Sequence, residues 1–219
     1  MLIIFSRHGN TFEADQKSYW VGSKEDLVLT SQGEKQAHLF GLSLKESGIQ
    51  KISIFTGPLK RTLKYAEIVS EYVDKIALKI DEALIELDYG LWNGLTNEEV
   101  RARYGSKELD SWVKDGIWPK NAQWLPIEDQ VKSASNYFIS KLKDQYQCNE
   151  GEVIIVISSN GRLRYLLEAC TQDDILSKMR DKASVKTGNI GVVRLNKFSA
   201  QVLFWNVSPD CETLKAIKG

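Results

Sequence analysis

An arginine and a histidine, Arg7 and His8, lie side by side directly after the first apolar run of the chain. A neutral imidazole can accept a phosphoryl group as a nucleophile when a hydrogen bond holds its other ring nitrogen. A guanidinium offers phosphate oxygens a planar fork of donors and keeps its charge. Arginine beside histidine is common by chance, but the position of this pair after a predicted strand favours phosphoryl transfer with His8 as the nucleophile.

A second arginine, Arg61, lies at the predicted start of a helix, within the stretch 56–66. The free N–H groups and the dipole at the start of a helix favour an anion. Negative charge on the equatorial oxygens of a phosphoryl group must be stabilised in the transition state. We therefore expect Arg7 and Arg61 to bind the phosphate together; the alternative is that Arg61 is an ordinary arginine on the surface of a helix.

Three short apolar runs, each followed by small or polar residues and then by a helical pattern, span 2–5, 52–55 and 153–157. This alternation is typical of a parallel α/β sheet. Ligands bind to such sheets at the carboxyl ends of the strands. The polar loops that follow the three runs, at 6–11, 56–62 and 158–162, should therefore meet at one rim.

The remaining predicted elements are strands at 77–80, 190–195 and 201–207 and helices at 30–44, 60–73 and 129–146. From 98 to 126 the regular pattern breaks down, yet the segment carries Trp112, Trp118 and Trp124. Linkers rarely contain so many aromatic residues. We therefore predict one domain, residues 1–219, with a small cap inserted at about 98–126.

The composition limits the function classes. The 219 residues include 29 Lys plus Arg and 29 Asp plus Glu, so no overall charge attracts nucleic acid or an anionic membrane. No stretch approaches the roughly 20 apolar residues of a membrane span. The three cysteines, Cys148, Cys170 and Cys211, have no metal-ligand spacing and indicate reduced thiols of a cytoplasmic protein.

Four blocks of the chain resemble, in order, motifs of the histidine phosphatase superfamily, which includes cofactor-dependent phosphoglycerate mutases and many phosphomonoesterases. The blocks are Arg7-His8-Gly9-Asn10-Thr11, Leu29-Thr30-Ser31-Gln32-Gly33 with Gln36-Ala37, Gly57-Pro58-Leu59-Lys60-Arg61-Thr62 with Ala66-Glu67, and Leu84 to Thr96. The resemblance covers nearly the whole chain. It implies a three-layer α/β/α sandwich with a mostly parallel mixed sheet, a phosphohistidine on His8, a small phosphorylated substrate, and neither metal nor cofactor.

The resemblance also assigns roles to single residues. In such enzymes a carboxyl from the last block protonates the leaving oxygen, and Glu86 is the residue that matches, with Glu82 and Asp88 as alternatives. Partial burial among apolar neighbours would suit this acid. Asn10 and Gly22, both in the loop after the first strand, match positions that approach the substrate.

The chain departs from the family pattern in its last block, which normally reads Ser-His-Gly. Ser159 stands where the second histidine is expected, so that a charged donor is missing. Ser159 and Asn160 can still donate hydrogen bonds to phosphate. Loss of one preorganised donor costs about 3 kcal/mol of transition-state stabilisation. We expect Arg162 to be a plain surface arginine, with replacement of the missing charge as the alternative.

Other positions near the motifs carry weaker signals. Ala14 stands where many members have an asparagine that helps to bind phosphate. His38 is expected on the surface of a helix, away from the site. Trp20, Trp92 and the cap tryptophans could pack on an organic leaving group, but we expect most of these rings to be buried in the cap.

Three functions are consistent with the sequence. The first is a phosphatase that hydrolyses a small-molecule phosphate monoester through a phosphohistidine. The second is a catalytically impaired protein that binds a phosphorylated ligand or serves in regulation, which the loss of the second histidine at Ser159 favours. The third, a phosphoglycerate-type mutase, is less favoured because the site would have to retain an intermediate with fewer cationic donors.

Overall fold

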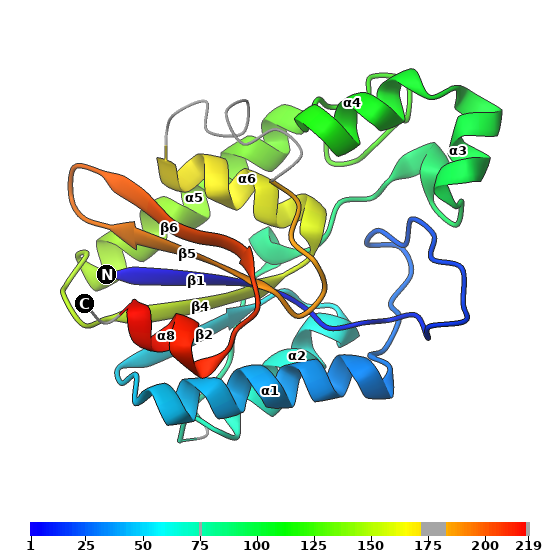
Figure 1. Ribbon diagram of the computed structural model, residues 1–219. Coiled ribbons are helices and arrows are strands. Elements are labelled where there is room, and N and C mark those ends of the chain that lie inside the picture. The colour runs from blue at the N-terminus through cyan, green and yellow to red at the C-terminus, as the bar shows by residue number, and fades with distance from the viewer. Residues whose placement is uncertain (75, 172–182, 218–219) are drawn as a thin grey trace.

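The computed structural model describes residues 1–74, 76–171 and 183–217, and its described strands form one sheet of six in the order β3-β2-β4-β1-β5-β6 (Figure 1). The strands are β1 Leu2–Arg7, β2 Ile52–Thr56, β3 Lys79–Ile80, β4 Val153–Ser158, β5 Ile190–Leu195 and β6 Ala200–Val207. Strands β1 to β4 pair with one another in parallel, whereas β5 pairs antiparallel with both of its neighbours, β1 and β6. The prediction of a mostly parallel mixed sheet is confirmed.

Helices cover both faces of this sheet. The described helices are α1 Ser31–Ser47, α2 Lys60–Ser70, α3 Asn97–Tyr104, α4 Lys107–Asp115, α5 Glu128–Tyr146, α6 Asn160–Thr171 and α8 Cys211–Ala216, with short 3-10 turns η1 Glu82–Leu84 and η2 Gly90–Trp92. Figure 1 shows α5 and α6 above the sheet and α1, α2 and α8 below it. The predicted three-layer sandwich is therefore confirmed.

The two core layers follow from the alternation of side chains along the strands. Ile3 and Phe5 of β1 point to the α5 and α6 side, where they pack in one cluster with Phe138 and Leu163. Ile4 points to the opposite side and packs with residues of α1 and α2. Every residue of β4 is buried, as expected for a central strand covered on both faces.

Local signals explain where α1 begins and ends. The Thr30 hydroxyl accepts a hydrogen bond from the Gly33 N–H (3.1 Å), which caps the first turn. The helix ends at Gly48, whose φ of 64° is in the left-handed region that glycine adopts without strain. The helix extends three residues past the predicted end at 44, because Ser47 packs inward.

The predicted cap segment contains two short helices, α3 and α4, which extend beyond the sheet in Figure 1. Its core is a cluster of aromatic rings around Trp124, whose ring centroid lies 5.0 Å from that of Trp92 and 4.8 Å from that of Trp112. These three side chains are buried. The expectation that most of the tryptophans are buried is correct for them.

Three negative findings apply to the described ranges. None of the helices there is long and apolar enough to cross a membrane. No group of three or more His, Cys, Asp or Glu side chains in the same ranges is placed to hold a metal ion. All three cysteines lie in these ranges and are free, so no disulfide links the elements.

Candidate active site

The loops after β1, β2 and β4 meet at the carboxyl edge of the sheet, as the sequence predicts. Arg7 is opposite Ser158 in the register of β1 and β4, and the His8 N–H donates to the Ser158 carbonyl (3.1 Å). The Gly57 N–H donates to the Ile157 carbonyl (3.1 Å). These backbone bonds bring three distant parts of the chain to one rim.

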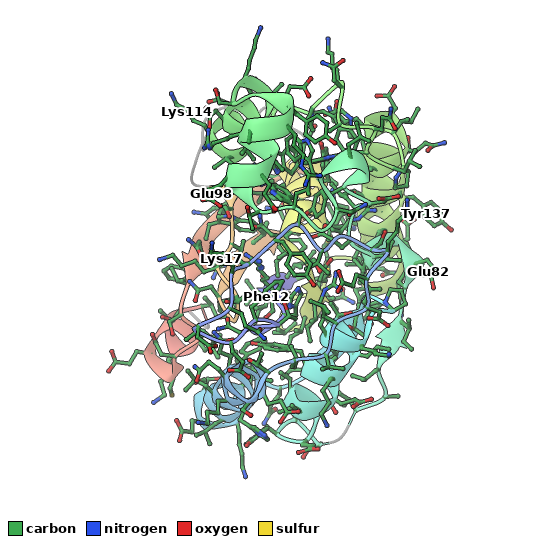
Figure 2. The ribbon with its side chains drawn as sticks, turned by 90° about the vertical axis from the view of Figure 1, so that its right-hand side faces the viewer. Phe12, Lys17, Glu82, Glu98, Lys114 and Tyr137 are labelled. Carbon is green, nitrogen blue, oxygen red and sulfur yellow. The ribbon has the colours of Figure 1, made fainter. Side chains whose placement is uncertain are left out.

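A cavity of about 450 Å³ opens at this rim. Figure 2 looks onto this end of the molecule, with Phe12 of the loop after β1 near the centre. Of the eight predicted site residues, all but Ser159 line the cavity: Arg7, His8, Asn10, Gly22, Arg61, Glu86 and Asn160. The residues that sequence reasoning selected for chemistry therefore share one space.

His8 is held in the state that a nucleophile needs. Its side chain is buried, and its Nδ1 lies 2.7 Å from the Gly9 carbonyl oxygen. A carbonyl can only accept, so Nδ1 carries the proton and Nε2 keeps its lone pair. Burial, and then the positive charges of Arg61 and Arg7, hold the pKa of His8 well below its usual value, although the Gly9 hydrogen bond acts in the other direction. The imidazole is therefore neutral at neutral pH.

This burial predicts a pH dependence of stability. In the unfolded chain His8 takes up a proton near pH 6.5, whereas the folded protein does so only at lower pH. The unfolded state therefore binds more protons as the pH falls through this value, and the free energy of unfolding drops by at most about 1.4 kcal/mol per pH unit. His8→Gln removes this titration. Urea unfolding between about pH 7.5 and 5.5 should show the wild type losing stability relative to the variant; a constant difference would contradict the assignment.

Arg61 is buried, so the alternative of an ordinary surface arginine is wrong. Its Nη2 donates to the Gly22 carbonyl (2.8 Å) and its Nη1 to the Glu25 carbonyl (3.2 Å). Arg7 donates from Nη1 to the Val185 carbonyl (2.7 Å). Both arginine residues line the cavity and are bound there by backbone oxygens, so their guanidinium groups are preorganised for an anion that enters it.

Of the three candidate carboxylates, only Glu86 lines the cavity. Its Oε1 accepts from the N–H groups of Leu87 (2.9 Å) and Arg162 (3.1 Å), and its Oε2 accepts from that of Gly161 (3.2 Å). Glu82 is exposed on η1. Asp88 instead accepts from the Asn93 side chain and pairs with Lys24 (3.0 Å).

Among the polar residues of the rim, Asn160 and Asn10 are oriented by neighbours. The Val185 N–H donates to Asn160 Oδ1 (2.8 Å), which leaves the amide NH₂ of Asn160 as a donor. The Thr187 hydroxyl donates to Asn10 Oδ1. Ser159 is buried, and its Oγ has no hydrogen-bond partner among the described residues. Ser159, which stands where the second histidine is expected, is therefore not among the described residues that line the cavity, whereas Asn160 is.

The prediction that Arg162 is a surface arginine is wrong. The expected surface arginine is buried, and so is the next arginine of α6, Arg164. Arg162 does not line the cavity, because its Nε donates to the Ile85 carbonyl (2.9 Å) and its Nη1 to the Val131 carbonyl (3.4 Å). His38, by contrast, is exposed on α1 as expected.

Sequence reasoning missed several lining residues. Tyr89 hydrogen-bonds to Glu86, and its pKa is raised well above its usual value by burial and by the Glu86 charge. Tyr89 lies three residues after Glu86 in one of the blocks that resemble the family, and this position could have identified it as a site residue. Phe12, Tyr19 and Asn97 also line the cavity, and no sequence signal singled them out. Trp20 lines it as well, and its ring also packs against those of Tyr89 and Trp92 in the cap core.

Gly161 is required by the packing around Glu86. A Cβ at this position would lie 2.7 Å from Glu86 Oε1 and 2.6 Å from the Tyr89 hydroxyl. Gly161→Ala should therefore displace the carboxylate and cost about 1–3 kcal/mol of stability through overpacking. For the expected hydrolysis of a phosphate ester, it should lower kcat more than it raises KM. Steady-state kinetics and urea unfolding measure the two effects. An alanine variant with wild-type kcat and stability would show that this contact is not tight in solution.

Comparison with known proteins finds relatives in sequence and in fold. The model of the histidine phosphatase superfamily (branch 1) matches residues 3–208. The 2,3-bisphosphoglycerate-dependent phosphoglycerate mutase of Allorhizobium ampelinum is 28% identical over 200 residues, 89% of this chain and 90% of that relative. Two solved structures have the same fold. Mycobacterial hydrolase 2 has a TM-score of 0.80 at 18% identity, with 100% of this chain and 97% of that chain covered. A mycobacterial glucosyl-3-phosphoglycerate phosphatase has a TM-score of 0.77 at 17% identity, with 94% and 99% covered.

Proposed function

The chain belongs to the histidine phosphatase superfamily, and from that premise we propose that it hydrolyses a phosphate monoester of a small organic alcohol through a phosphohistidine on His8. The observation that carries this proposal is the buried, neutral imidazole of His8, with Nδ1 bonded to the Gly9 carbonyl. Such an imidazole has its Nε2 lone pair free for phosphorus. The likeness of the fold to that of a phosphatase supports the reaction class.

The proposed reaction has two balanced steps. First, the Nε2 lone pair of His8 forms a bond to phosphorus while the bond from phosphorus to the alcohol oxygen breaks. Glu86 gives its proton to this oxygen, and the alcohol leaves. Water then attacks phosphorus, the N–P bond breaks, and Glu86 takes up the proton of the water. Arg7 and Arg61 stabilise the phosphoryl oxygens in both steps.

The charges of the cavity favour an alcohol without a second anionic group. Among the described lining residues, the cations are Arg7 and Arg61, and both are assigned to the phosphate. The acidic residues among the described lining residues are Glu86, assigned as the acid, and Glu13. The other residues that line the cavity from the loop after β1 and from α3 are uncharged, and they include the polar residues Gln16, Ser18 and Asn97 and the aromatic residues Phe12, Tyr19 and Trp20. Hydroxyl groups beside an apolar face, as in a sugar, match such a wall.

A mutase is the second candidate, because the curated relative from Allorhizobium ampelinum is a phosphoglycerate mutase at 28% identity. A phosphoglycerate carries a carboxylate in addition to its phosphate. Among the described lining residues no third cation is present to bind that carboxylate, and Glu13 adds a negative charge to the lining. Like charges held close together repel, so the balance of charge favours hydrolysis of an uncharged alcohol ester.

A substrate panel tests the proposal. Sugar phosphates, nucleotides and phosphoglycerates are incubated with the protein, released phosphate is measured, and phosphoglycerate products are followed by ³¹P NMR. We expect phosphate release, fastest for esters of uncharged alcohols. Isomerisation of a phosphoglycerate without phosphate release would support the mutase instead. Thermal stabilisation by these compounds without any turnover would support the impaired binding protein.

We also propose that the protein is located in the cytoplasm. All three cysteines are free, and disulfides are rare in the reducing cytoplasm. This supports a cytoplasmic location. Mass spectrometry of the protein taken from its own cells under alkylating conditions should find all three thiols reduced.

A further inference from the structure

Arg162 lies in the first turn of α6 and binds the segment that carries Glu86 at two points. Its backbone N–H donates to Glu86 Oε1 (3.1 Å), and its Nε donates to the carbonyl of Ile85 (2.9 Å), the residue before Glu86. The side chain is 2% exposed and does not line the cavity. It can therefore affect the reaction only from outside the cavity, through the residues that it binds and through its charge, which also acts on Glu86.

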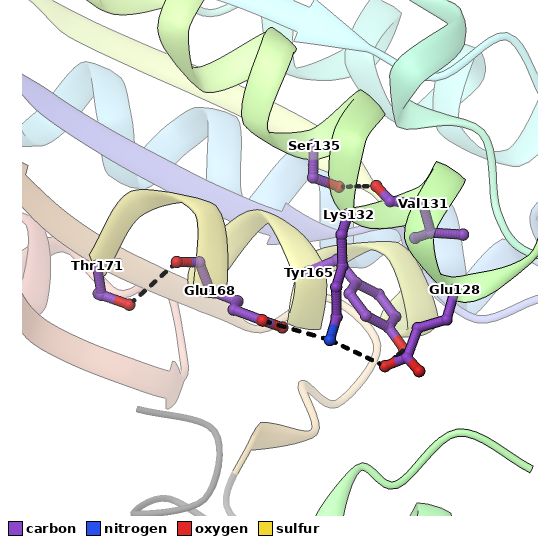
Figure 3. A network of polar contacts seen from close by, with 7 residues as sticks. All are labelled: Glu128, Val131, Lys132, Ser135, Tyr165, Glu168 and Thr171. Atoms are coloured by element: carbon purple, nitrogen blue, oxygen red, sulfur yellow. Dashed lines mark hydrogen bonds and ion pairs between the residues drawn. The ribbon is translucent and has the colours of Figure 1, made fainter. Parts of the chain in front are cut away.

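The third bond of Arg162 ties this segment to α5. Its Nη1 donates to the Val131 carbonyl (3.4 Å), which also accepts from the Ser135 hydroxyl (2.9 Å). Figure 3 shows that this part of α5 is cross-linked to α6, where Lys132 bridges Glu128 (3.2 Å) and Glu168 (3.7 Å). Arg162 thus connects the Glu86 segment to a fixed pair of helices.

Glu86 depends on such contacts because it lies between η1 and η2, outside any helix or strand. Of the three N–H groups that bind its carboxylate, two belong to α6, those of Gly161 and Arg162. A general acid must lie within hydrogen-bond reach of the leaving oxygen, and a displacement of about 1 Å can cost on the order of a hundredfold in rate. The placement of Glu86 is therefore set mainly by α6.

We propose that Arg162 is a positioning residue, which holds the Glu86 carboxyl where it can protonate the leaving alcohol. This inference rests on the proposed function, in which Glu86 is the general acid. A planar guanidinium can bind the Ile85 and Val131 carbonyls at once, because its donors point in different directions. Lysine has the charge but lacks this fork, so it cannot replace Arg162.

The test uses two esters that differ in their need for an acid. The phenolate of p-nitrophenyl phosphate leaves without a proton, whereas the alkoxide of glycerol phosphate needs one. The rate of alcohol release is measured in the first turnover, with enzyme in excess, because this rate reports only the first step and not the water attack, which also uses Glu86. In Arg162→Gln and Arg162→Lys, the rate of glycerol release should fall about tenfold or more, and the rate of p-nitrophenol release should change by less than about twofold. The ratio of the two rates is taken within one preparation, so any unfolded fraction cancels.

Two reference variants complete the experiment. Glu86→Gln should show the same selective loss at about a hundredfold or more. Arg164→Gln is the matched control: Arg164 lies on the same helix and is equally buried, but it donates to the Trp112 carbonyl (2.9 Å) and lies over the Trp112 ring. Its rate ratio should equal that of the wild type.

The outcomes separate the two proposals. If Glu86→Gln is selective but either Arg162 variant keeps the wild-type ratio, or loses both rates equally, the positioning role is refuted and the proposed function stands. The positioning role is also refuted, and the proposed function stands, if Arg164→Gln changes the ratio of the two rates as much as Arg162→Gln does. A general effect of burial or charge would then explain both variants. If Glu86→Gln loses both rates equally, or if the wild type hydrolyses neither ester, the proposed function fails and the role of Arg162 fails with it.

Discussion

Replacing His8 with alanine should lower kcat for phosphate ester hydrolysis by about 10⁴-fold or more, because no other described side chain in the cavity can serve as a neutral nitrogen nucleophile. Binding of the substrate should weaken much less, since Arg7 and Arg61 remain to hold the phosphate. Steady-state kinetics give the loss in kcat, and inorganic phosphate as a competitive ligand in calorimetry gives the affinity.

The chain supplies a matched control for this variant. His38 is the other of the two histidines; it is exposed on α1, where its Nδ1 lies 3.0 Å from the Tyr72 hydroxyl. His38→Ala should keep wild-type kcat. Equal losses in the two variants, or a His8→Ala variant with more than about a tenth of the wild-type rate, would contradict the assignment of the nucleophile.

Replacing Arg61 with glutamine should lower kcat/KM by about 10³-fold. The guanidinium supplies charge to the phosphoryl oxygens, and its bonds to the Gly22 and Glu25 carbonyls fix the loop that forms the outer cavity wall. Arg61→Lys keeps the charge without the fork and should recover only part of the loss. Both values come from initial rates with a sugar phosphate.

Lys60→Gln serves as the control, because Lys60 is exposed in the first turn of the same helix and does not line the cavity. It removes one positive charge near the site without touching the phosphate position. We expect a change in kcat/KM of less than about twofold, since exposed charges are well screened. A loss as large as that of Arg61→Gln would mean that the general field, not a direct contact, stabilises the phosphate.

The layers of the fold could be predicted from the sequence because the apolar runs are long and regular. Buried strands such as β4 have no polar residue until they reach the rim, and α1 has both its cap at Thr30 and its glycine stop at Gly48. The helices α3 and α4 were not predicted. Helix α3 is short, polar and has little periodicity, whereas α4 has a short apolar face with Leu109 and Trp112 that its sequence contains. Thr96 and Glu99 do form a capping box at the start of α3, a signal that the sequence contains.

The burial of arginines could not be predicted, because it depends on partners that are distant in the chain. Arg61 is bound by carbonyls 36 and 39 residues away, and Arg162 by carbonyls 31 and 77 residues away. Residue type indicates a surface position for each. Only the folded geometry shows that backbone oxygens replace water around these groups.

The sequence also could not predict which residue would line the cavity at the position of the missing second histidine. Sequence position alone puts Ser159 at the site, yet the turn between β4 and α6 buries its side chain and leaves Asn160 in the cavity wall. A shift of one residue at the start of a helix turns a side chain by about 100°. Which of two neighbouring residues faces a ligand is thus set by the helix start.

The most direct test of the account is to trap the intermediate. The protein is mixed with a hydrolysed ester carrying labelled phosphate, quenched in strong base within the first turnover, digested, and examined by mass spectrometry. We predict one phosphoryl group on the peptide that contains His8, stable in base and lost in acid. Continued turnover with no such group on His8, or with the label on another residue, would contradict the account.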